Sequence, residues 1–199
     1  ADEKLGKAIL KNEGVPSDKK LLGVSVRKWQ NLGSDFETQI ANACDYAYEK
    51  YGYYTVFLPM QSSRDTAIMQ NIKRKMKHES AIIKKRYSVE GMLSIIKCFD
   101  MCIGMRLHTL IYAAINSVPL IGLVYDPKIN SFMEYTHQRH DVDVNEVTDE
   151  NLKKMLDECV ANYDTIKQDL KENYSHLKEK AKLNGKYAIE LYEKGSVTL

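Results

Sequence analysis

The amino-acid sequence predicts one α/β domain, in which a parallel sheet is covered by helices on both faces. Strand-like and helix-like segments alternate five times, and residues 119–125 (PLIGLVY) form a near-continuous apolar run. Such alternation is typical of parallel sheets whose strands are joined by helical crossovers. A strand that is apolar throughout indicates burial on both faces, as expected in the middle of a doubly wound sheet.

The strand signal is a short apolar run of a length typical of buried strands. The first run (LLGVSVRKW) contains β-branched residues and a glycine, the second (YYTVFLPM) is closed by Pro59, the third is weak and the fourth is very short. We therefore expect strands over 21–29, 53–60, 81–87, 101–105 and 119–125.

The helix signal is a repeat of apolar residues at spacings of three and four. It predicts helices over 35–51, over a segment that Asp65 caps and that extends to Met76, over 88–99 and over 106–117. The last of these is apolar nearly all round, which indicates burial on more than one side. Residues 1–20 are polar, with a helical start and a break at 14–17 (GVPS).

The C-terminal part of the sequence is interpreted as helical. Residues 149–184 contain neither proline nor glycine and repeat apolar residues at helical spacing, which predicts one long helix or two in tandem. Asp126 and Pro127 are interpreted as a turn. We expect a single domain over 1–199, with its core in 21–147 and C-terminal helices over 149–194.

Composition excludes several classes of function. Of the 199 residues, 44% are hydrophobic and 28% are charged, and the formal net charge of +2 does not favour nucleic acid as a partner. No apolar run is long enough to span a membrane, and no signal-peptide segment is expected. The four cysteines are Cys44, Cys98, Cys102 and Cys159. They form no CxxC pair, which favours reduced thiols and a cytoplasmic location.

Ligands of doubly wound domains bind beyond the carboxyl ends of the strands. The most informative segment there is GMRLH, in which Gly104 ends a strand and a helix opens with Arg106 and His108. Free N–H groups and the dipole at that helix end attract anions, and arginine adds a planar fork that matches phosphate or carboxylate. The alternative is structural: Arg106 pairs with a buried carboxylate, and His108 only completes a layer of the core.

Other strand ends offer further candidates. Arg27 follows the first strand, where an arginine taken alone is better explained as a surface charge, and Lys128 is the plausible ligand contact after the fifth strand. Trp29 is a candidate for stacking on a ring, with packing as the commoner role. His137 and His140 have no carboxylate or cysteine at ligand spacing, so we expect no metal site.

Four segments taken together resemble bacterial polysaccharide pyruvyl transferases, most closely those that pyruvylate secondary cell-wall polysaccharide. The segments are 24–27 (VSVR), 57–61 (FLPMQ), 103–108 (IGMRLH) and 118–128 (VPLIGLVYDPK). They stand in the same order as in the C-terminal half of that family, and the resemblance covers about residues 21–135. The combination of GMRLH with YDPK is the most specific part.

The resemblance implies a Rossmann-like, C-terminal half of a GT-B-like two-domain fold, with the active site in the cleft between the halves. It implies phosphoenolpyruvate as the donor substrate, no cofactor, and a lipid-linked glycan containing N-acetylmannosamine as the acceptor that receives a 4,6-ketal. The N-terminal half of the family is absent from this sequence, so the isolated domain is expected to be inactive. The lipid-linked acceptor also implies peripheral contact of the full enzyme with the inner face of the membrane.

This chemistry suits the candidate residues. Phosphoenolpyruvate has a phosphate and a carboxylate, for which Arg27, Arg106 and Lys128 are the expected anchors. His108 is the expected acid or base, since histidine is the residue type whose reference pKa lies nearest neutral pH, or else it is a phosphate ligand. One alternative is a glycosyltransferase or epimerase that uses a UDP-sugar, with Glu134 on the ribose. The other is a non-catalytic binding domain that docks through residues 149–199.

Overall fold

The computed structural model describes residues 1–30, 32–33 and 35–193, without the side chains of Ser62 and Ser63. Its centre is a parallel sheet of six strands in the order β3-β2-β1-β4-β5-β6. The strands are β1 (Lys20–Ser25), β2 (Tyr53–Phe57), β3 (Ser80–Ile82), β4 (Met101–Gly104), β5 (Leu120–Val124) and β6 (Asp141–Asp143). This order is that of a doubly wound sheet whose direction of winding reverses between β1 and β4. The predicted fold class is confirmed.

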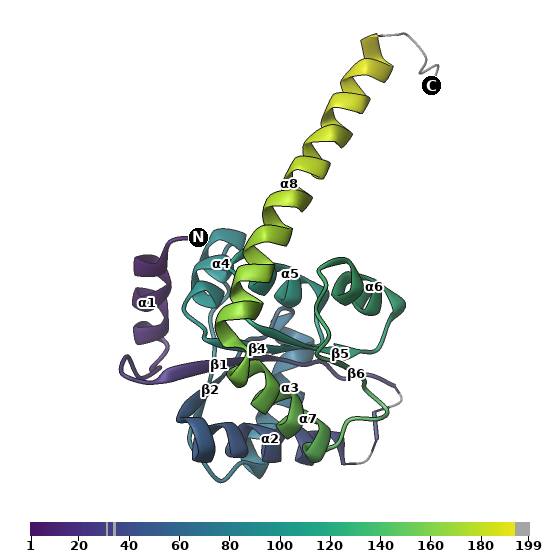
Figure 1. The fold of residues 1–199 in the computed structure, drawn as a ribbon. Coiled ribbons are helices and arrows are strands. Elements are labelled where there is room, and N and C mark those ends of the chain that lie inside the picture. Colours follow the sequence, from purple (N-terminus) through teal and green to yellow (C-terminus); the bar gives the residue numbers. More distant parts are fainter. Residues whose placement is uncertain (31, 34, 194–199) are drawn as a thin grey trace.

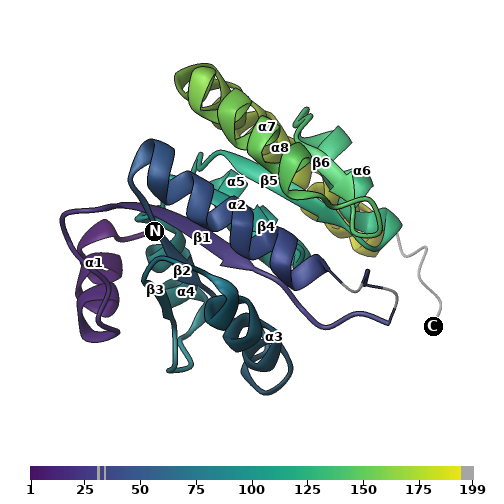
Figure 2. The ribbon, with the colours of Figure 1, turned by 90° about the horizontal axis from the view of Figure 1, so that it is seen from below.

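Helices cover both faces of the sheet (Figures 1 and 2). One face is covered by α1 (Glu3–Asn12), α4 (Val89–Lys97), α5 (Leu107–Ile115) and α6 (Pro127–Tyr135). The other is covered by α2 (Phe36–Tyr51), α3 (Ser62–Lys75) and α7 (Asp149–Ala161). Strands β1, β2, β4 and β5 are buried almost throughout, because apolar side chains on both of their faces meet a helical layer.

The N-terminal helix is part of the packed body. Ile9 and Leu10 of α1 are buried, and Gly6 brings α1 close to α4. A Cβ atom at Gly6 would lie 2.0 Å from the carbonyl oxygen of Ser94, so only glycine permits this approach. The Asp2 amide also donates to Ser94 Oγ at 3.2 Å. These contacts fix the position of the chain that follows α1.

The C-terminal helices are two in tandem, α7 and α8 (Tyr163–Glu193), with a break at Asn162. Helix α8 starts beside the body, where Ile166 and Leu170 are buried, and then extends away from it (Figure 1). Its 31 residues span about 46 Å at 1.5 Å per residue. No helix in the described part of the chain combines the length and apolar character that crossing a membrane requires.

Several local predictions were wrong. The third strand ends at Ile82, five residues before the predicted boundary, and the residues that follow form a loop. A sixth, short and polar edge strand was not predicted, because Asp-Val-Asp has no apolar run to reveal it. The segment interpreted as a turn begins α6, with Asp126 as N-cap and Pro127 in the first turn, since turns and helix starts use the same residues. Asp65 does not cap α3, which begins three residues earlier at Ser62.

Candidate functional site

The sheet register brings three predicted cations to one edge. Ser25 of β1 is paired with Gly104 of β4, and Gly104 is paired with Gly122 of β5. The Met105 amide continues this ladder by donating to the Ser25 carbonyl at 2.8 Å. Arg27 and Arg106 therefore follow adjacent strands by the same number of residues, and Lys128 follows the next strand. All three lie at the carboxyl edge, where ligands of this fold class bind.

The turn from β4 into α5 explains the glycine of the GMRLH motif. A Cβ atom at Gly104 would lie 2.6 Å from Leu110 Cδ2, so a larger residue would force the Leu110 side chain to shift where α5 packs onto the strand. Arg106 is the N-cap of α5, not part of its first turn, and it makes no side-chain cap bond. A guanidinium has no acceptor and so cannot cap helical N–H groups. The side chain is free to turn elsewhere.

Arg106 turns to Asp65 of α3. Its Nε donates to Asp65 Oδ2 at 3.1 Å, and its second terminal nitrogen donates to Oδ1. Asp65 has no exposed side-chain surface, and the Arg106 side chain is 14% exposed. The backbone N–H of Gln61 also donates to Asp65 Oδ2, at 2.8 Å. A buried carboxylate needs such a partner, and the pairing largely compensates the charge of Arg106.

Arg27 has a different environment, made of rings. Its guanidinium lies 5.4 Å from the ring centroid of Trp29 and 5.5 Å from that of Tyr125. The Tyr125 hydroxyl accepts a long bond from Arg27 at 3.5 Å, and the buried Nε of Arg27 has no hydrogen-bond partner among the described residues. Aromatic faces attract a guanidinium without neutralising it. Arg27 therefore keeps its positive charge.

Lys128 adjoins the same ring as Arg27. Its Nζ lies 5.8 Å from the centroid of the Tyr125 ring and forms an ion pair of 3.1 Å with Asp126. The pKa of Asp126 is lowered, chiefly by the hydrogen bond from the Lys128 backbone amide and then by the one from its side chain. Asp126 is thus an anion at neutral pH that holds the start of α6. Arg27 and Lys128 form one group around Tyr125, which we call the Tyr125 cluster, with Trp29 as its fourth member.

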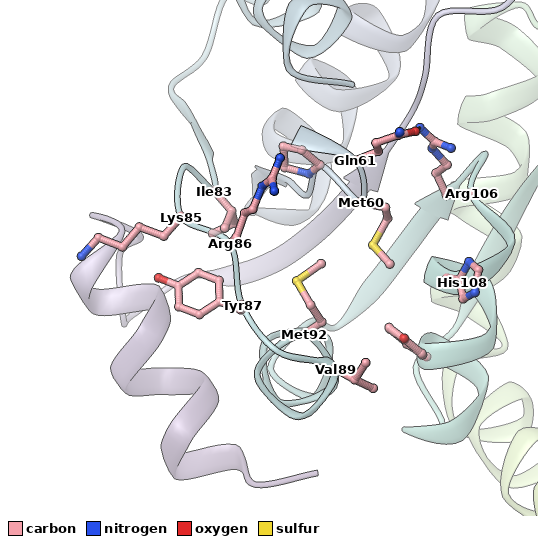
Figure 3. A pocket seen from close by; sticks show the side chains of 12 residues that line it. Met60, Gln61, Ile83, Lys85, Arg86, Tyr87, Val89, Met92, Arg106 and His108 are labelled. Carbon is pink, nitrogen blue, oxygen red and sulfur yellow. The ribbon is translucent and has the colours of Figure 1, made fainter. Parts of the chain in front are cut away.

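His108 and Arg106 line a separate hollow (Figure 3), a pocket of about 580 Å³ formed by the segments that follow β2, β3 and β4. Arg27 and Lys128 are not among its lining residues. His108 is exposed in the first turn of α5, and its ring lies 6.2 Å from that of Tyr112. The structure therefore brings the four predicted site residues to one edge of the sheet, but it divides them between the pocket and the Tyr125 cluster.

Sequence reasoning missed part of the pocket wall. Lys85 and Arg86, in the loop between β3 and α4, also line it. The run Lys-Lys-Arg directly after an apolar pair could have indicated a basic loop at a strand end. It was missed because the predicted third strand included these residues. Among the described residues, no group of three or more histidine, cysteine, aspartate or glutamate side chains is placed to hold a metal ion.

The cysteines are structural. All four are free in the structure. Burial raises the pKa of the Cys44 and Cys159 thiols to about 12, so neither forms a thiolate near neutral pH. No nucleophilic role is assigned to them.

Comparison with solved structures identifies the class of fold. A complex of MnaA with UDP from S. aureus superposes with a TM-score of 0.61 at 11% identity, over 83% of this chain and 42% of that one. UDP-GlcNAc 2-epimerase from Neisseria meningitidis, bound to UDP-GlcNAc, gives a TM-score of 0.59 at 10% identity, over 84% and 43%. The C-terminal domain of a glycosyl transferase group 1 family protein from Francisella tularensis gives 0.58 at 12% identity, over 91% and 98%.

These matches define a domain of the GT-B class, and the chain spans about two fifths of the first two structures. At this level of identity they show the fold alone. A search of curated proteins finds no match. The model of the polysaccharide pyruvyl transferase family matches residues 3–127, more than half of the chain, and the chain belongs to that family. The match begins within α1, about 20 residues before the first of the four motif segments, and it includes the Lys-Lys-Arg loop.

Proposed function

We propose that this domain binds phosphoenolpyruvate and takes part in moving its pyruvyl group onto two hydroxyls of a cell-wall glycan as a 4,6-ketal. The family establishes a polysaccharide-modifying transferase, and the proposal adds the donor, the bond formed and the acceptor. The observation that supports it best is the set of cations at the ends of β1, β4 and β5, with His108 in the first turn of α5. A donor with both a phosphate and a carboxylate needs more than one cationic anchor.

The reaction balances with a single proton donor and acceptor. Protonation of the donor's methylene carbon makes C2 electrophilic, and a sugar hydroxyl adds there and loses its proton. Phosphate then leaves from C2, the second hydroxyl closes the ring on the same carbon, and its proton is released. The products are the ketal and phosphate. We assign the proton transfers to His108, whose exposed ring borders the pocket.

The anchors have distinct roles in this proposal. Arg27 holds one anionic group of the donor, because rings and not carboxylates flank it. Lys128, which adjoins the Tyr125 ring and is paired with Asp126, is the second anchor. Arg106 presents its remaining N–H groups to the ligand, and Asp65 fixes its orientation from beneath. A rigid guanidinium positions a reacting group better than a mobile one. Transfer to the acceptor is expected to require the second half of a GT-B enzyme, because the active site of that class lies between the two halves.

Ligand-dependent unfolding of the 199-residue chain tests the proposal. Phosphoenolpyruvate at about 100 times its dissociation constant should raise the melting temperature by roughly 5–10 °C. Arg27→Gln should remove most of this shift, whereas Lys28→Gln, the same loss of charge on the exposed neighbouring residue, should retain it. Stabilisation by UDP and not by phosphoenolpyruvate would favour the UDP-sugar alternative. Stabilisation by neither would favour a binding domain.

A further inference from the structure

The ring of Tyr125 is the contact that joins the two cations of the Tyr125 cluster. This residue directly follows β5, and its side chain is half-buried. The guanidinium of Arg27 lies 5.5 Å from the centroid of the ring, and the ammonium of Lys128 lies 5.8 Å from it. Because β4 separates β1 from β5 in the sheet, the contact with Arg27 crosses the end of β4. Two anchors that follow different strands are therefore brought to one side chain.

Arg27 depends on aromatic rings for its orientation. Within the described part of the chain, one terminal nitrogen donates to the Tyr125 hydroxyl at 3.5 Å, which is long for a hydrogen bond, and the buried Nε has no partner. The rings of Trp29 and Tyr125 lie 4.6 Å apart, and both adjoin the guanidinium. A guanidinium stacks well on aromatic faces. The two rings thus hold the side chain, as Asp65 holds Arg106, but they leave its charge available to a ligand.

Lys128 combines its ring contact with an exposed ion pair. Its Nζ lies 3.1 Å from Asp126 Oδ2, and 51% of its side chain is exposed. Asp126 also accepts from the Lys128 backbone amide at 3.0 Å, because it is the N-cap of α6. Exposed ion pairs are weak, so an anionic ligand can replace Asp126 as the partner of the ammonium. The Tyr125 ring, unlike the carboxylate, does not compete with an anion for that charge.

The ring contacts order both cations before a ligand arrives. Arginine and lysine side chains are long, and ordering them at the moment of binding lowers affinity. Rings that hold them beforehand reduce this loss, whereas carboxylates would hold them and also compensate their charge. The ring of Tyr125 matters more than its hydroxyl, since both cations adjoin the ring whereas the hydroxyl takes part in one long bond.

We propose that Tyr125 is a positioning residue, whose ring orients Arg27 and Lys128 toward one anionic ligand so that the two cations act as a coupled pair. The identification of this ligand as phosphoenolpyruvate rests on the proposed function. The coupling itself rests on the contacts of the ring, so inorganic phosphate bound at the cluster should show it as well. A purely structural role of Tyr125 would change the stability of the fold and leave the two cations independent.

The single tryptophan of the chain makes a direct test possible. The ring of Trp29 lies against that of Tyr125, so tryptophan fluorescence reports an anion bound at the cluster. Phosphoenolpyruvate and inorganic phosphate are titrated into the full chain, and calorimetry checks the dissociation constants. Tyr125→Leu should weaken phosphoenolpyruvate roughly tenfold, the scale expected when two long side chains must be ordered on binding. Tyr125→Phe retains the ring and should stay within about threefold, the loss expected for one weak hydrogen bond.

Tyr135→Leu is the matched control. Tyr135, at the end of α6, has the Lys180 ammonium 5.8 Å from its ring centroid and lies outside the cluster. Its loss should leave the affinity within about twofold, as expected for a surface substitution. A double-variant cycle measures the coupling: Arg27→Gln should weaken phosphoenolpyruvate less in a Tyr125→Leu background than in the wild type. Urea denaturation confirms folding, and Tyr125→Met, which also lacks the ring, replaces Tyr125→Leu if that variant does not fold.

A folded Tyr125→Leu variant that binds phosphoenolpyruvate as tightly as the wild type would overturn the positioning role and leave the proposed donor intact. Equal losses in the Leu and Phe variants would also overturn it, because they would assign the effect to the hydroxyl. Additive losses in the cycle would show two independent anchors, with the same consequence. Inorganic phosphate whose binding depends on Tyr125, in a chain that does not bind phosphoenolpyruvate, would support the positioning role and refute the donor. Binding of neither anion would refute both.

Discussion

The arginine after β1 and the arginine after β4 occupy equivalent places on adjacent strands, yet their environments differ. Arg106 forms a two-bonded ion pair with Asp65, whose side chain is fully buried. Arg27 lies between the rings of Trp29 and Tyr125 and has no ion pair within the described residues. The charge of Arg106 is compensated by a buried carboxylate, whereas the charge of Arg27 is not paired with a carboxylate at the edge of the sheet.

Position at a strand end therefore does not by itself define a ligand contact. The same offset from the register pair Ser25–Gly104 gives a compensated charge on one strand and an uncompensated one on its neighbour. What decides is the element opposite each side chain: α3 supplies a carboxylate to Arg106, whereas the segment after β5 supplies the Tyr125 ring to Arg27.

The largest expected effect concerns His108, which lies two residues after Arg106. In an enzyme with both halves, His108→Gln should lower turnover by roughly 100- to 10,000-fold if His108 transfers the proton. Steady-state kinetics should then show little change in the Michaelis constant for phosphoenolpyruvate. A raised Michaelis constant with turnover near its original value would instead make His108 a phosphate ligand. Circular dichroism of the variant controls for folding.

The next prediction tests how much the ion pair between Arg106 and Asp65 contributes to the free energy of unfolding. Asp65→Ala removes the partner of a largely buried guanidinium and should lower the free energy of unfolding by about 3–5 kcal/mol. Arg27→Ala loses cation–π contacts and one long hydrogen bond to Tyr125, and it should cost about 1 kcal/mol. Urea denaturation of both variants measures the two values. Equal losses would remove the contrast between the two arginines.

A smaller effect tests the free charge of Arg27. Arg27→Gln should weaken phosphoenolpyruvate roughly 10- to 100-fold, as expected for the loss of charged hydrogen bonds. The double variant Asp65→Asn with Arg106→Gln keeps the net charge of that pair unchanged and should lose less affinity. Calorimetric titration compares them. If the double variant loses more affinity than Arg27→Gln, Arg106 is the principal anchor.

The smallest effect concerns an exposed counterpart of the Asp65 pair. Asp157 of α7 accepts from Tyr46 and Tyr51 and pairs with Lys50 of α2 at 3.0 Å, with 39% of its side chain exposed. Desolvation raises the pKa of Asp157, but the hydrogen bonds outweigh it and the pKa is lowered. A lowered pKa gives stability that is present above the unfolded value of about 3.9 and lost as pH falls through the folded value.

Asp157→Asn should therefore cost about 1 kcal/mol at pH 7, as expected for an exposed pair. The gap between variant and wild type should shrink as the pH falls below about 4. Thermal unfolding across pH 3–7 measures it. A gap that does not change with pH would show that the contribution comes from packing and not from the carboxylate charge.

The fold class, the central strands and helices, the helical character of the C-terminal part and the candidate residues at the strand ends were predictable from the sequence, whereas the break at Asn162 between α7 and α8 was not. These features depend on local periodicity and on apolar runs, which neighbouring residues encode. Helix α6, the edge strand β6 and the true end of β3 at Ile82 were not predicted, because these short segments have no distinctive apolar pattern. The family's motifs also pointed to Arg27, Arg106, His108 and Lys128 as a set.

The division of these four residues between the pocket and the Tyr125 cluster depends on tertiary packing. Asp65 and Arg106 are 41 residues apart, and Glu13 is 71 residues from the Lys84 amide that it holds. Whether an arginine meets a buried carboxylate or an aromatic ring depends on which helix packs opposite it, and that choice is made by the whole core. The sequence places charges along the chain, but their compensation is a property of the packed sheet and its helical layers.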